Sequence, residues 1–166
     1  MFQFDCHAHV YETVAAISRA RYVPKVPAPL CAWKEKLNRQ KLAGGVIVQV
    51  SFLGTDNTEL CNALEGLDLE KFAGVAVVPL DVTEQELDRL VRIGVRGVRW
   101  NLVGTSDLPN SGSIPCQRFF EMLRARGLHL ELHLEGPRLA SQLPVLADQG
   151  LDIVIDHFGL PSEPLP

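Results

Sequence analysis

Six short apolar runs recur along the chain, and most of them are followed by a segment with helical periodicity. The runs are "FQFD" (2–5), "GVIVQV" (45–50), "GVAVVP" (74–79), "GVRGVRW" (94–100), "LHLELHL" (128–134) and "LDIVID" (151–156). Helical patterns lie between them at about 31–43, 57–66, 83–93, 115–126 and 137–148. This alternation is typical of a parallel α/β fold, because parallel strands need a crossover that is usually a helix.

The spacing of these strand-helix units favours a barrel among the parallel α/β folds. Each strand-helix unit takes roughly 30 residues, close to the ~31 per unit of a (β/α)8 barrel of ~250 residues. We therefore predict an α/β fold, a parallel (β/α) barrel of TIM type that is truncated to about six strand-helix units. The prediction is one domain over residues 1–166, incomplete at the C-terminus. A hydrophobic content of 46% is enough for one core.

Local signals support the helix assignments. Thr83 followed by Glu86 predicts a capping box, in which the hydroxyl and the carboxylate each bind a free backbone N–H group. Gly94 suits the end of the same helix. Pro115 and Pro137 fit first-turn positions, where the missing N–H group is not needed. The segment 19–30 contains three prolines and is predicted to be a long loop that could act as a lid.

Charge and cysteine content exclude several classes of partner. A net charge of -4 gives no broad basic surface, so we expect no nucleic acid and no anionic membrane as partner. The longest apolar run falls far short of the ~20 residues that span a bilayer. The four cysteines are widely spaced, and the N-terminus does not resemble a secretory signal, which favours a reduced, cytoplasmic protein. A small-molecule substrate is the expected partner.

Polar residues share one face of several predicted strands. Alternate residues of a strand point to the same side, so Asp5, His7 and His9 lie together if the extended conformation continues that far. The same rule places four leucines of "LHLELHLEG" on one face and His129, Glu131, His133 and Glu135 on the other. A polar face inside an α/β core is unusual, which makes this face a candidate site.

Further polar residues lie where strands end. Arg99 and Asn101 share a face on the fourth strand, Ser51 follows the second, and the sixth ends in Asp156 and His157. In parallel barrels the carboxyl ends of the strands meet at one mouth, which carries the active site. We therefore expect His7, His9, His133 and His157 to converge there.

Each of these residues also has a structural interpretation. His9 could cap a loop, and His129 and Glu131 could form a buried polar network that fills barrel layers. Arg99 alone is more typical of an ion-pair partner than of a substrate clamp, and Ser51 of a turn. The convergence of several strand ends favours the functional interpretation.

The stretches "FDCHAHV", "VIVQVSFLGTDN", "GVAVV", "GVRGVRWNL", "LHLELHLEG" and "VIDHFGLP" together resemble the amidohydrolase-related superfamily, in particular its branch of metal-dependent barrel hydrolases that includes pyrone lactonases. The resemblance implies a barrel in which the catalytic residues His7, His9 and His157 surround a scissile carbonyl. In relatives that use a metal, these three histidines help to hold one or two divalent ions, zinc or manganese; in the lactonase-like branch they polarise the carbonyl without a metal. The sequence leaves both open.

The resemblance also implies substrate-binding residues. Ser51 and Arg99 match positions that contact carboxylates of the substrate, and Tyr22 lies close to a binding tyrosine. A guanidinium can hold a carboxylate through two parallel hydrogen bonds. Asn101 and His133 are expected to contact the substrate or to support residues that do.

One feature departs from the family pattern. The family's general base is an aspartate at the end of strand eight, and no residue of this sequence matches it, since Asp156 belongs to a different strand. A barrel without its last two strands leaves strand edges open. Three accounts remain: a fragment, a chain completed by a partner or by self-association, or an open fold that has lost catalysis.

The leading hypothesis is a hydrolase that opens a lactone of a small carboxylated metabolite, by attack of water on a carbonyl polarised by histidines. A metal-dependent decarboxylase of an aromatic acid is an alternative within enzymes. The alternative from another class is a truncated, non-catalytic remnant that binds a small anion.

Overall fold

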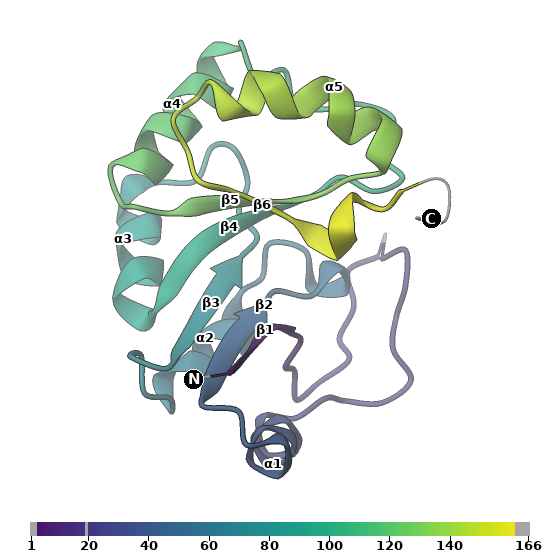
Figure 1. The fold of residues 1–166 in the computed structure, drawn as a ribbon, viewed down its shortest axis with the longest axis vertical. Coiled ribbons are helices and arrows are strands. Elements are labelled where there is room, and N and C mark those ends of the chain that lie inside the picture. Colours follow the sequence, from purple (N-terminus) through teal and green to yellow (C-terminus); the bar gives the residue numbers. More distant parts are fainter. Residues whose placement is uncertain (1–2, 19, 162–166) are drawn as a thin grey trace.

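The computed structural model describes residues 3–18 and 20–161 (Figure 1). Six strands form one parallel sheet in the order β1-β2-β3-β4-β5-β6. The strands are β1 (Phe4–Ala8), β2 (Gly44–Val48), β3 (Phe72–Ala76), β4 (Val95–Asn101), β5 (His129–His133) and β6 (Ile153–Ile155). The helices are α1 (Leu30–Gln40), α2 (Thr58–Glu65), α3 (Glu84–Ile93), α4 (Ile114–Arg124) and α5 (Gly136–Ala147), with short 3-10 turns η1 (Ser51–Leu53) and η2 (Asp156–Gly159).

The sheet is curved, and the helices lie along its outer side (Figure 1). Each strand pairs in parallel with the next strand in sequence, and β1 and β6 form the two ends of the sheet. This arrangement confirms the predicted α/β fold, a truncated barrel of TIM type; within the described residues five strands are each followed by an α-helix, and β6 is followed by the turn η2. Its concave side faces the long loop between β1 and α1, which begins after Ala8 and ends before Leu30. That loop contains the predicted segment 19–30, of which residue 19 lies outside the described residues.

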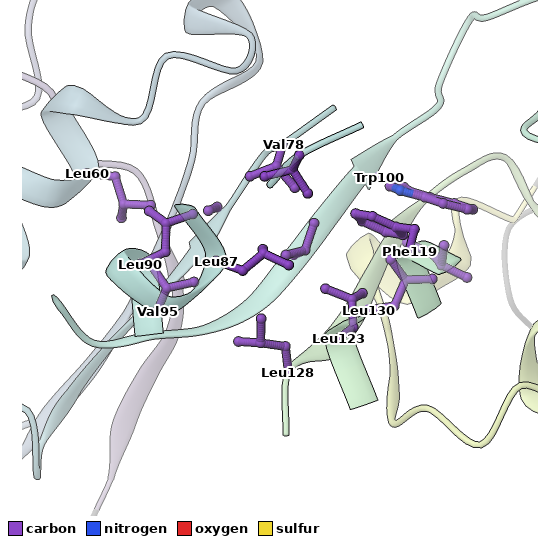
Figure 2. Close-up of a cluster of buried hydrophobic side chains, with 14 of the residues drawn as sticks. Leu60, Val78, Leu87, Leu90, Val95, Trp100, Phe119, Leu123, Leu128 and Leu130 are labelled. Carbon is purple, nitrogen blue, oxygen red and sulfur yellow. The ribbon is translucent and has the colours of Figure 1, made fainter. Parts of the chain in front are cut away.

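The apolar core lies between the outer face of the sheet and the helices (Figure 2). Leu87 and Leu90 of α3 and Phe119 of α4 are fully buried there. The four leucines of the β5 region are at most 3% exposed, which confirms the predicted alternation: Leu128, Leu130, Leu132 and Leu134. Because the leucines occupy the outer face, the charged residues between them must point to the concave side.

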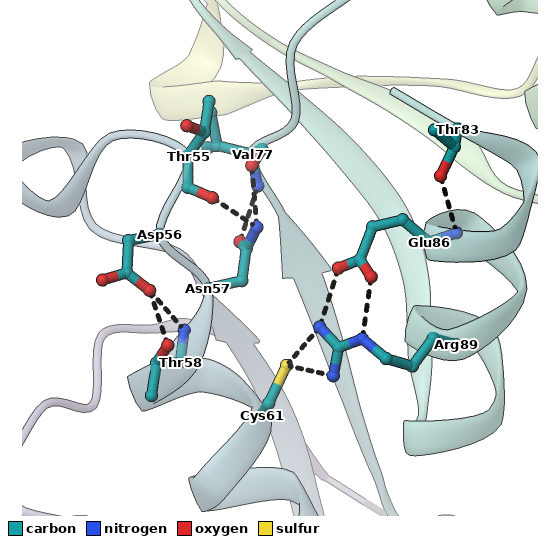
Figure 3. Close-up of polar contacts among 9 residues, drawn as sticks. All are labelled: Thr55, Asp56, Asn57, Thr58, Cys61, Val77, Thr83, Glu86 and Arg89. Atoms are coloured by element: carbon teal, nitrogen blue, oxygen red, sulfur yellow. Dashed lines mark hydrogen bonds and ion pairs between the residues drawn. The ribbon is translucent and has the colours of Figure 1, made fainter. Parts of the chain in front are cut away.

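The helix signals are confirmed with one exception. Thr83 accepts a hydrogen bond from the backbone N–H of Glu86 at 3.2 Å, and Gly94 ends α3 in a left-handed conformation. Both predicted first-turn prolines occupy the first turns of α4 and α5. The second half of the capping box is wrong: the Glu86 carboxylate binds the Arg89 guanidinium at 2.7 Å instead (Figure 3). A charge-assisted pair one turn along the helix therefore replaces the bond to a neutral backbone donor.

Strand β3 is displaced from its predicted range of 74–79, since it spans 72–76. It starts at Phe72 because Phe72 pairs with Gly45, and its end at Ala76 is explained by the side chain of Asn57, which is 6% exposed (Figure 3). Its Oδ1 accepts from the N–H of Val77 at 3.1 Å, and its Nδ2 donates to the Val77 carbonyl at 2.9 Å. The backbone of Val77 is thus bound to a side chain rather than to a neighbouring strand.

Strand β1 runs to Ala8, beyond its predicted end, because Ala8 pairs with Ile47. Residue 2 of the predicted strand lies outside the described residues.

Replacing Asn57 with alanine is expected to lower the free energy of unfolding by about 1–3 kcal/mol, because it leaves buried backbone groups without partners. Chemical denaturation followed by circular dichroism measures this change. Asn62 on α2 is exposed, and Asn62→Ala serves as the matched control with a change within about 0.5 kcal/mol. Equal effects of the two substitutions would contradict the assigned role of Asn57.

The surface at the two ends of the sheet is partly apolar. Phe4 on β1 is 45% exposed, and Val154 on β6 is 42% exposed.

All four cysteines are free thiols. Within residues 3–18 and 20–161, no helix combines the length and the hydropathy that crossing a bilayer requires.

Candidate functional site

The strand ends build one cavity of about 270 Å³ on the concave side of the sheet. Its lining includes seven residues predicted from the sequence: His9, Tyr22, Ser51, Arg99, Asn101, His133 and His157. His7 is outside this lining, but its ring centre lies 5.0 Å from that of His9 and 5.2 Å from that of His157. The predicted convergence therefore occurs, from strands β1, β4 and β5 and the turns after β2 and β6.

Three imidazole rings lie close together. The ring centre of His157 is 5.2 Å from that of His7 and 4.7 Å from that of His133. The backbone of His157 has a φ of 50°, in the left-handed region that residues with a side chain rarely adopt. Such a conformation costs about 1–2 kcal/mol. The turn η2 thus holds the ring in place at an energetic cost, a feature that is common at functional sites.

Three buried charged residues, Arg99, Asp156 and Glu131, form a cluster that contacts these histidines and is called the ion cluster below. Arg99 contacts His133, and Asp156 contacts His7. The Arg99 guanidinium, 3% exposed, binds one carboxylate oxygen of Asp156 through Nε at 2.7 Å and through Nη2 at 2.6 Å. Its Nε also lies 3.0 Å from Oε1 of Glu131. That contact is an ion pair without hydrogen-bond geometry, because Glu131 Oε1 has no hydrogen-bond partner among the described residues. One cation therefore faces two buried carboxyl groups.

Because one cation faces two buried carboxyl groups, the pKa values of Glu131 and Asp156 are shifted in opposite directions. Burial, and next the charge of Asp156, raise the pKa of Glu131 to about 7. Burial acts in the same direction on Asp156, but a hydrogen bond from His7 and the charge of Arg99 outweigh it and hold the pKa of Asp156 well below its usual range. Asp156 is therefore the permanent anion of the cluster, and Glu131 is partly protonated near neutral pH.

Contacts of the ion cluster fix the tautomer of His133. Its Nδ1 lies 2.9 Å from Nη2 of Arg99. A guanidinium only donates hydrogen bonds, so Nδ1 is the acceptor and the proton of the neutral ring is on Nε2. Burial, followed by the positive charge of Arg99, lowers the pKa of His133 to about 4. His133 thus presents an N–H donor from a neutral ring.

A titration by nuclear magnetic resonance is expected to show His133 neutral at pH 6, with a midpoint near pH 4. Because the folded pKa is below the ordinary 6.5, the unfolded chain binds this proton first as the pH falls. The histidine therefore destabilises the fold progressively as the pH falls from about 6.5 to about 4. The pH dependence of unfolding should be weaker in His133→Gln over this window, and an unchanged dependence would contradict the assignment.

In the neutral ring of His7 the proton is on Nδ1, whereas in His133 it is on Nε2. Its Nδ1 lies 3.2 Å from Oδ1 of Asp156, a carboxylate that accepts a hydrogen bond. The proton of the neutral ring is therefore on Nδ1, and Nε2 carries a free lone pair. This Nε2 is buried and has no hydrogen-bond partner among the described residues. A histidine oriented by a carboxylate in this way is typical of metal ligands and of general bases.

The donor set fits a divalent cation. His7, Asp156 and His157 each offer a ligand atom, and these atoms all lie within 4.8 Å of one another. Imidazole nitrogen and carboxylate oxygen suit zinc or manganese. His9 is not in this group, and its Nδ1 lies 2.7 Å from the carbonyl oxygen of Val48. The role of His9 as a metal ligand stays a prediction, and Asp156 joins the set.

Asp156, Glu131 and Arg21 are charged residues of this site to which the sequence gave no catalytic, binding or metal role. Two of them had a signal: Asp156 stands next to His157, and Glu131 shares a strand face with His133. Arg99 is an ion-pair partner, as one interpretation of the sequence expected; its contact with a substrate stays a prediction. Tyr22 is 67% exposed at the mouth.

The chain resembles proteins of known family and structure. The family model described as amidohydrolase matches residues 4–165. A protein of Comamonas testosteroni named 2-pyrone-4,6-dicarboxylate hydrolase is 29% identical over an alignment of 167 positions, which covers 95% of this chain and 52% of that protein.

Two solved structures share the fold at higher identity. A probable 2-pyrone-4,6-dicarboxylic acid hydrolase from Acinetobacter baumannii, with citric acid bound, has a TM-score of 0.90 and 37% identity, over 96% of this chain and 59% of that one. A putative 2-pyrone-4,6-dicarboxylic acid hydrolase from Pseudomonas putida has a TM-score of 0.86 and 38% identity, over 96% and 58%. The chain thus spans somewhat more than half the length of these relatives. With the family model matched over almost all of its residues, the chain belongs to the amidohydrolase family.

Proposed function

We propose that this site opens a lactone ring in a small carboxylated metabolite by attack of water on the ring carbonyl. The observation that carries the proposal is a pair of complementary tautomers: an N–H donor on His133, which lines the cavity, and a free lone pair on His7, whose ring centre lies 5.0 Å from that of His9 in the same lining. Ester hydrolysis needs both, a donor for the oxygen that gains charge and an acceptor for a proton of water. The names of the relatives from C. testosteroni, A. baumannii and P. putida agree with this chemistry.

The charge of the cavity favours an anionic ligand. Among the described residues, its lining includes Arg21 and Arg99 and no carboxylate. Nη1 of Arg99 has no hydrogen-bond or ion-pair partner within the described part of the chain, whereas Nε and Nη2 are bound to the ion cluster. This nitrogen is available to a carboxylate of the substrate, and Ser51 on the same wall offers a hydroxyl donor.

In the proposed reaction, the carbonyl oxygen accepts a hydrogen bond from Nε2–H of His133. Water attacks the carbonyl carbon as Nε2 of His7 takes one of its protons, and the ion pair with Asp156 stabilises the resulting imidazolium. The tetrahedral intermediate then breaks its bond to the ring oxygen. That oxygen receives the proton from His7, which returns the site to its starting state.

A divalent ion would be held by His7, Asp156 and His157. When bound, it would supply Lewis-acid polarisation of the carbonyl and activation of water. The tautomer of His7, with its lone pair on Nε2, is the form that both a ligand and a base require.

Incubation of the chain with 2-pyrone-4,6-dicarboxylate tests the proposal. We expect the ultraviolet absorbance of the pyrone to disappear, measured with zinc or manganese added and with a chelator instead. Release of carbon dioxide rather than a ring-opened acid would identify a decarboxylase. Stabilisation of the fold by the pyrone without turnover would identify a binding protein, and either result would contradict the proposed hydrolase.

A further inference from the structure

The loop between β1 and α1 supplies part of the wall of the cavity at the strand ends. The lining residues that come from this loop are His9, Tyr11, Arg21, Tyr22 and Pro24. The histidines of the proposed proton transfers, His7 and His133, lie instead on strands β1 and β5. The shape of the cavity therefore depends on where the loop is held, whereas the proposed chemistry depends on the sheet.

The loop is closed on itself at its base. The N–H of Tyr11 donates to the carbonyl of Ala28 at 2.9 Å, and the N–H of Ala28 donates back to the carbonyl of Tyr11 at 3.1 Å. Beside this pair, the carboxylate of Glu12 accepts a hydrogen bond at 3.1 Å from the N–H of Leu30, the first residue of α1. A surface loop whose two ends lie together in this way is typically a compact unit. A contact that fixes the base therefore positions the whole loop.

Glu59, in the first turn of α2, connects this base to the barrel. Its Oε2 accepts from the N–H of Glu12 at 3.1 Å. Its Oε1 accepts from the N–H of Thr13 at 3.1 Å and from the Thr13 hydroxyl at 2.8 Å. Hydrogen bonds to a carboxylate are stronger than those between neutral groups. Leu60 and Leu64 of α2 are buried in the core, so the loop is bound to a fixed helix.

Two further hydrogen bonds reach from the loop to the barrel. The N–H of Ile17 donates to the carbonyl of Phe52 at 2.8 Å, and Nη1 of Arg21 donates to the carbonyl of Val103. Each is a single bond, whereas Glu59 makes three. Glu59 does not line the cavity, so it can act on a ligand there only through the loop.

We propose that Glu59 is a positioning residue: it holds the base of the loop, keeps the loop wall over the cavity, and so raises the affinity of the site for its substrate. It takes no part in the proton transfers. The effect on substrate affinity rests on the proposed function; the effect on the loop does not.

Amide hydrogen exchange followed by nuclear magnetic resonance tests the effect on the loop. In Glu59→Gln, the carboxylate is lost and an amide NH₂ group is placed beside backbone donors. The amides of Tyr11, Ile17 and Ala28 donate to carbonyls and not to Glu59. They should nevertheless exchange about 10-fold faster in the variant, because the loop opens more often. Glu65→Gln is the matched control, since Glu65 is exposed at the end of the same helix, and should change these rates by less than about twofold.

Steady-state kinetics with 2-pyrone-4,6-dicarboxylate tests the effect on the site. Glu59→Gln should raise KM by about 5- to 20-fold and leave kcat within about twofold, because the loop contacts the ligand and the sheet carries the chemistry. Loss of stability alone would lower the amount of active protein and leave KM unchanged. Glu65→Gln should match wild type in both constants to within about twofold.

Several outcomes overturn the inference. Faster exchange confined to the two amides that Glu59 binds would mean that it holds only its direct partners, and an unchanged KM in Glu59→Gln would mean that the cavity wall does not depend on it. If Glu59→Gln does not fold, Thr13→Val decides, because it keeps the carboxylate and removes only the hydroxyl bond; exchange about threefold faster at the same three amides is expected, and wild-type rates would overturn the inference.

The proposed function fails separately, because hydrogen exchange needs no substrate. If wild type does not hydrolyse the pyrone while the loop amides exchange faster in Glu59→Gln, the hydrolase assignment is wrong and Glu59 still positions the loop.

Discussion

Arg99→Met is expected to lower the free energy of unfolding by about 3–5 kcal/mol, the usual cost of removing one partner of a buried ion pair. The guanidinium is the only cation that the described residues place against both Asp156 and Glu131. Without it, the low-pKa carboxylate of Asp156 stays buried with only His7 beside it. Methionine keeps much of the length of the side chain, so the expected loss is electrostatic rather than a loss of packing.

The matched control for Arg99 is on the same strand. Arg96 is exposed on the opposite side of β4, and its Nη1 donates to the backbone carbonyls of Val91 and Val95. Arg96→Met should cost less than about 1 kcal/mol, because the side chain is exposed and water can take its place at these carbonyls. Urea denaturation of both variants measures the difference. If Arg99→Met is no more destabilising than Arg96→Met, the ion cluster does not have the structural role assigned to it.

His7→Gln is expected to reduce the turnover of 2-pyrone-4,6-dicarboxylate by about 10²- to 10⁴-fold, the usual contribution of a positioned general base. Glutamine retains a polar side chain but cannot take a proton from water at neutral pH. The fold should be retained, because Asp156 keeps its two bonds to Arg99. Rates are measured from the absorbance of the pyrone and compared at equal amounts of folded protein.

His129→Gln provides the control for this prediction. His129 begins β5, at the opposite end of the strand from His133, and burial lowers its pKa. It does not line the cavity at the strand ends. Its replacement should leave turnover within about twofold of wild type. Comparable losses in the two variants would argue that His7 acts through stability alone, and full activity of His7→Gln would remove it from the mechanism.

Much of the fold could be predicted from the sequence because it follows from local patterns. The alternation in "LHLELHL" depends only on which side chains enter the apolar layer, and the structure buries those leucines as expected. The range of β3 could not be predicted in this way. It depends on Asn57, a residue 20 positions away whose amide binds both backbone groups of Val77.

The candidate site, like the fold, could be predicted from the sequence only where local patterns determine it. The histidines could be predicted because each stands at the end of an apolar run, where parallel strands place functional groups. The role of Asp156 could not, because its partners His7 and Arg99 come from β1 and β4 and reach it only when the sheet curves. Arg21 gave no signal in the sequence, since a loop residue becomes recognisable only through its contact with Val103.

A crystal structure of His7→Gln with 2-pyrone-4,6-dicarboxylate bound tests the central claim most directly, because this variant is expected to bind the lactone and turn it over slowly. The ring carbonyl oxygen should lie within hydrogen-bonding distance of Nε2 of His133, with one carboxylate at Nη1 of Arg99. A pyrone bound elsewhere, for example in the cavity that Trp33 and Lys36 of α1 line together with His7 and His9, away from His133 and Arg99, would contradict the account.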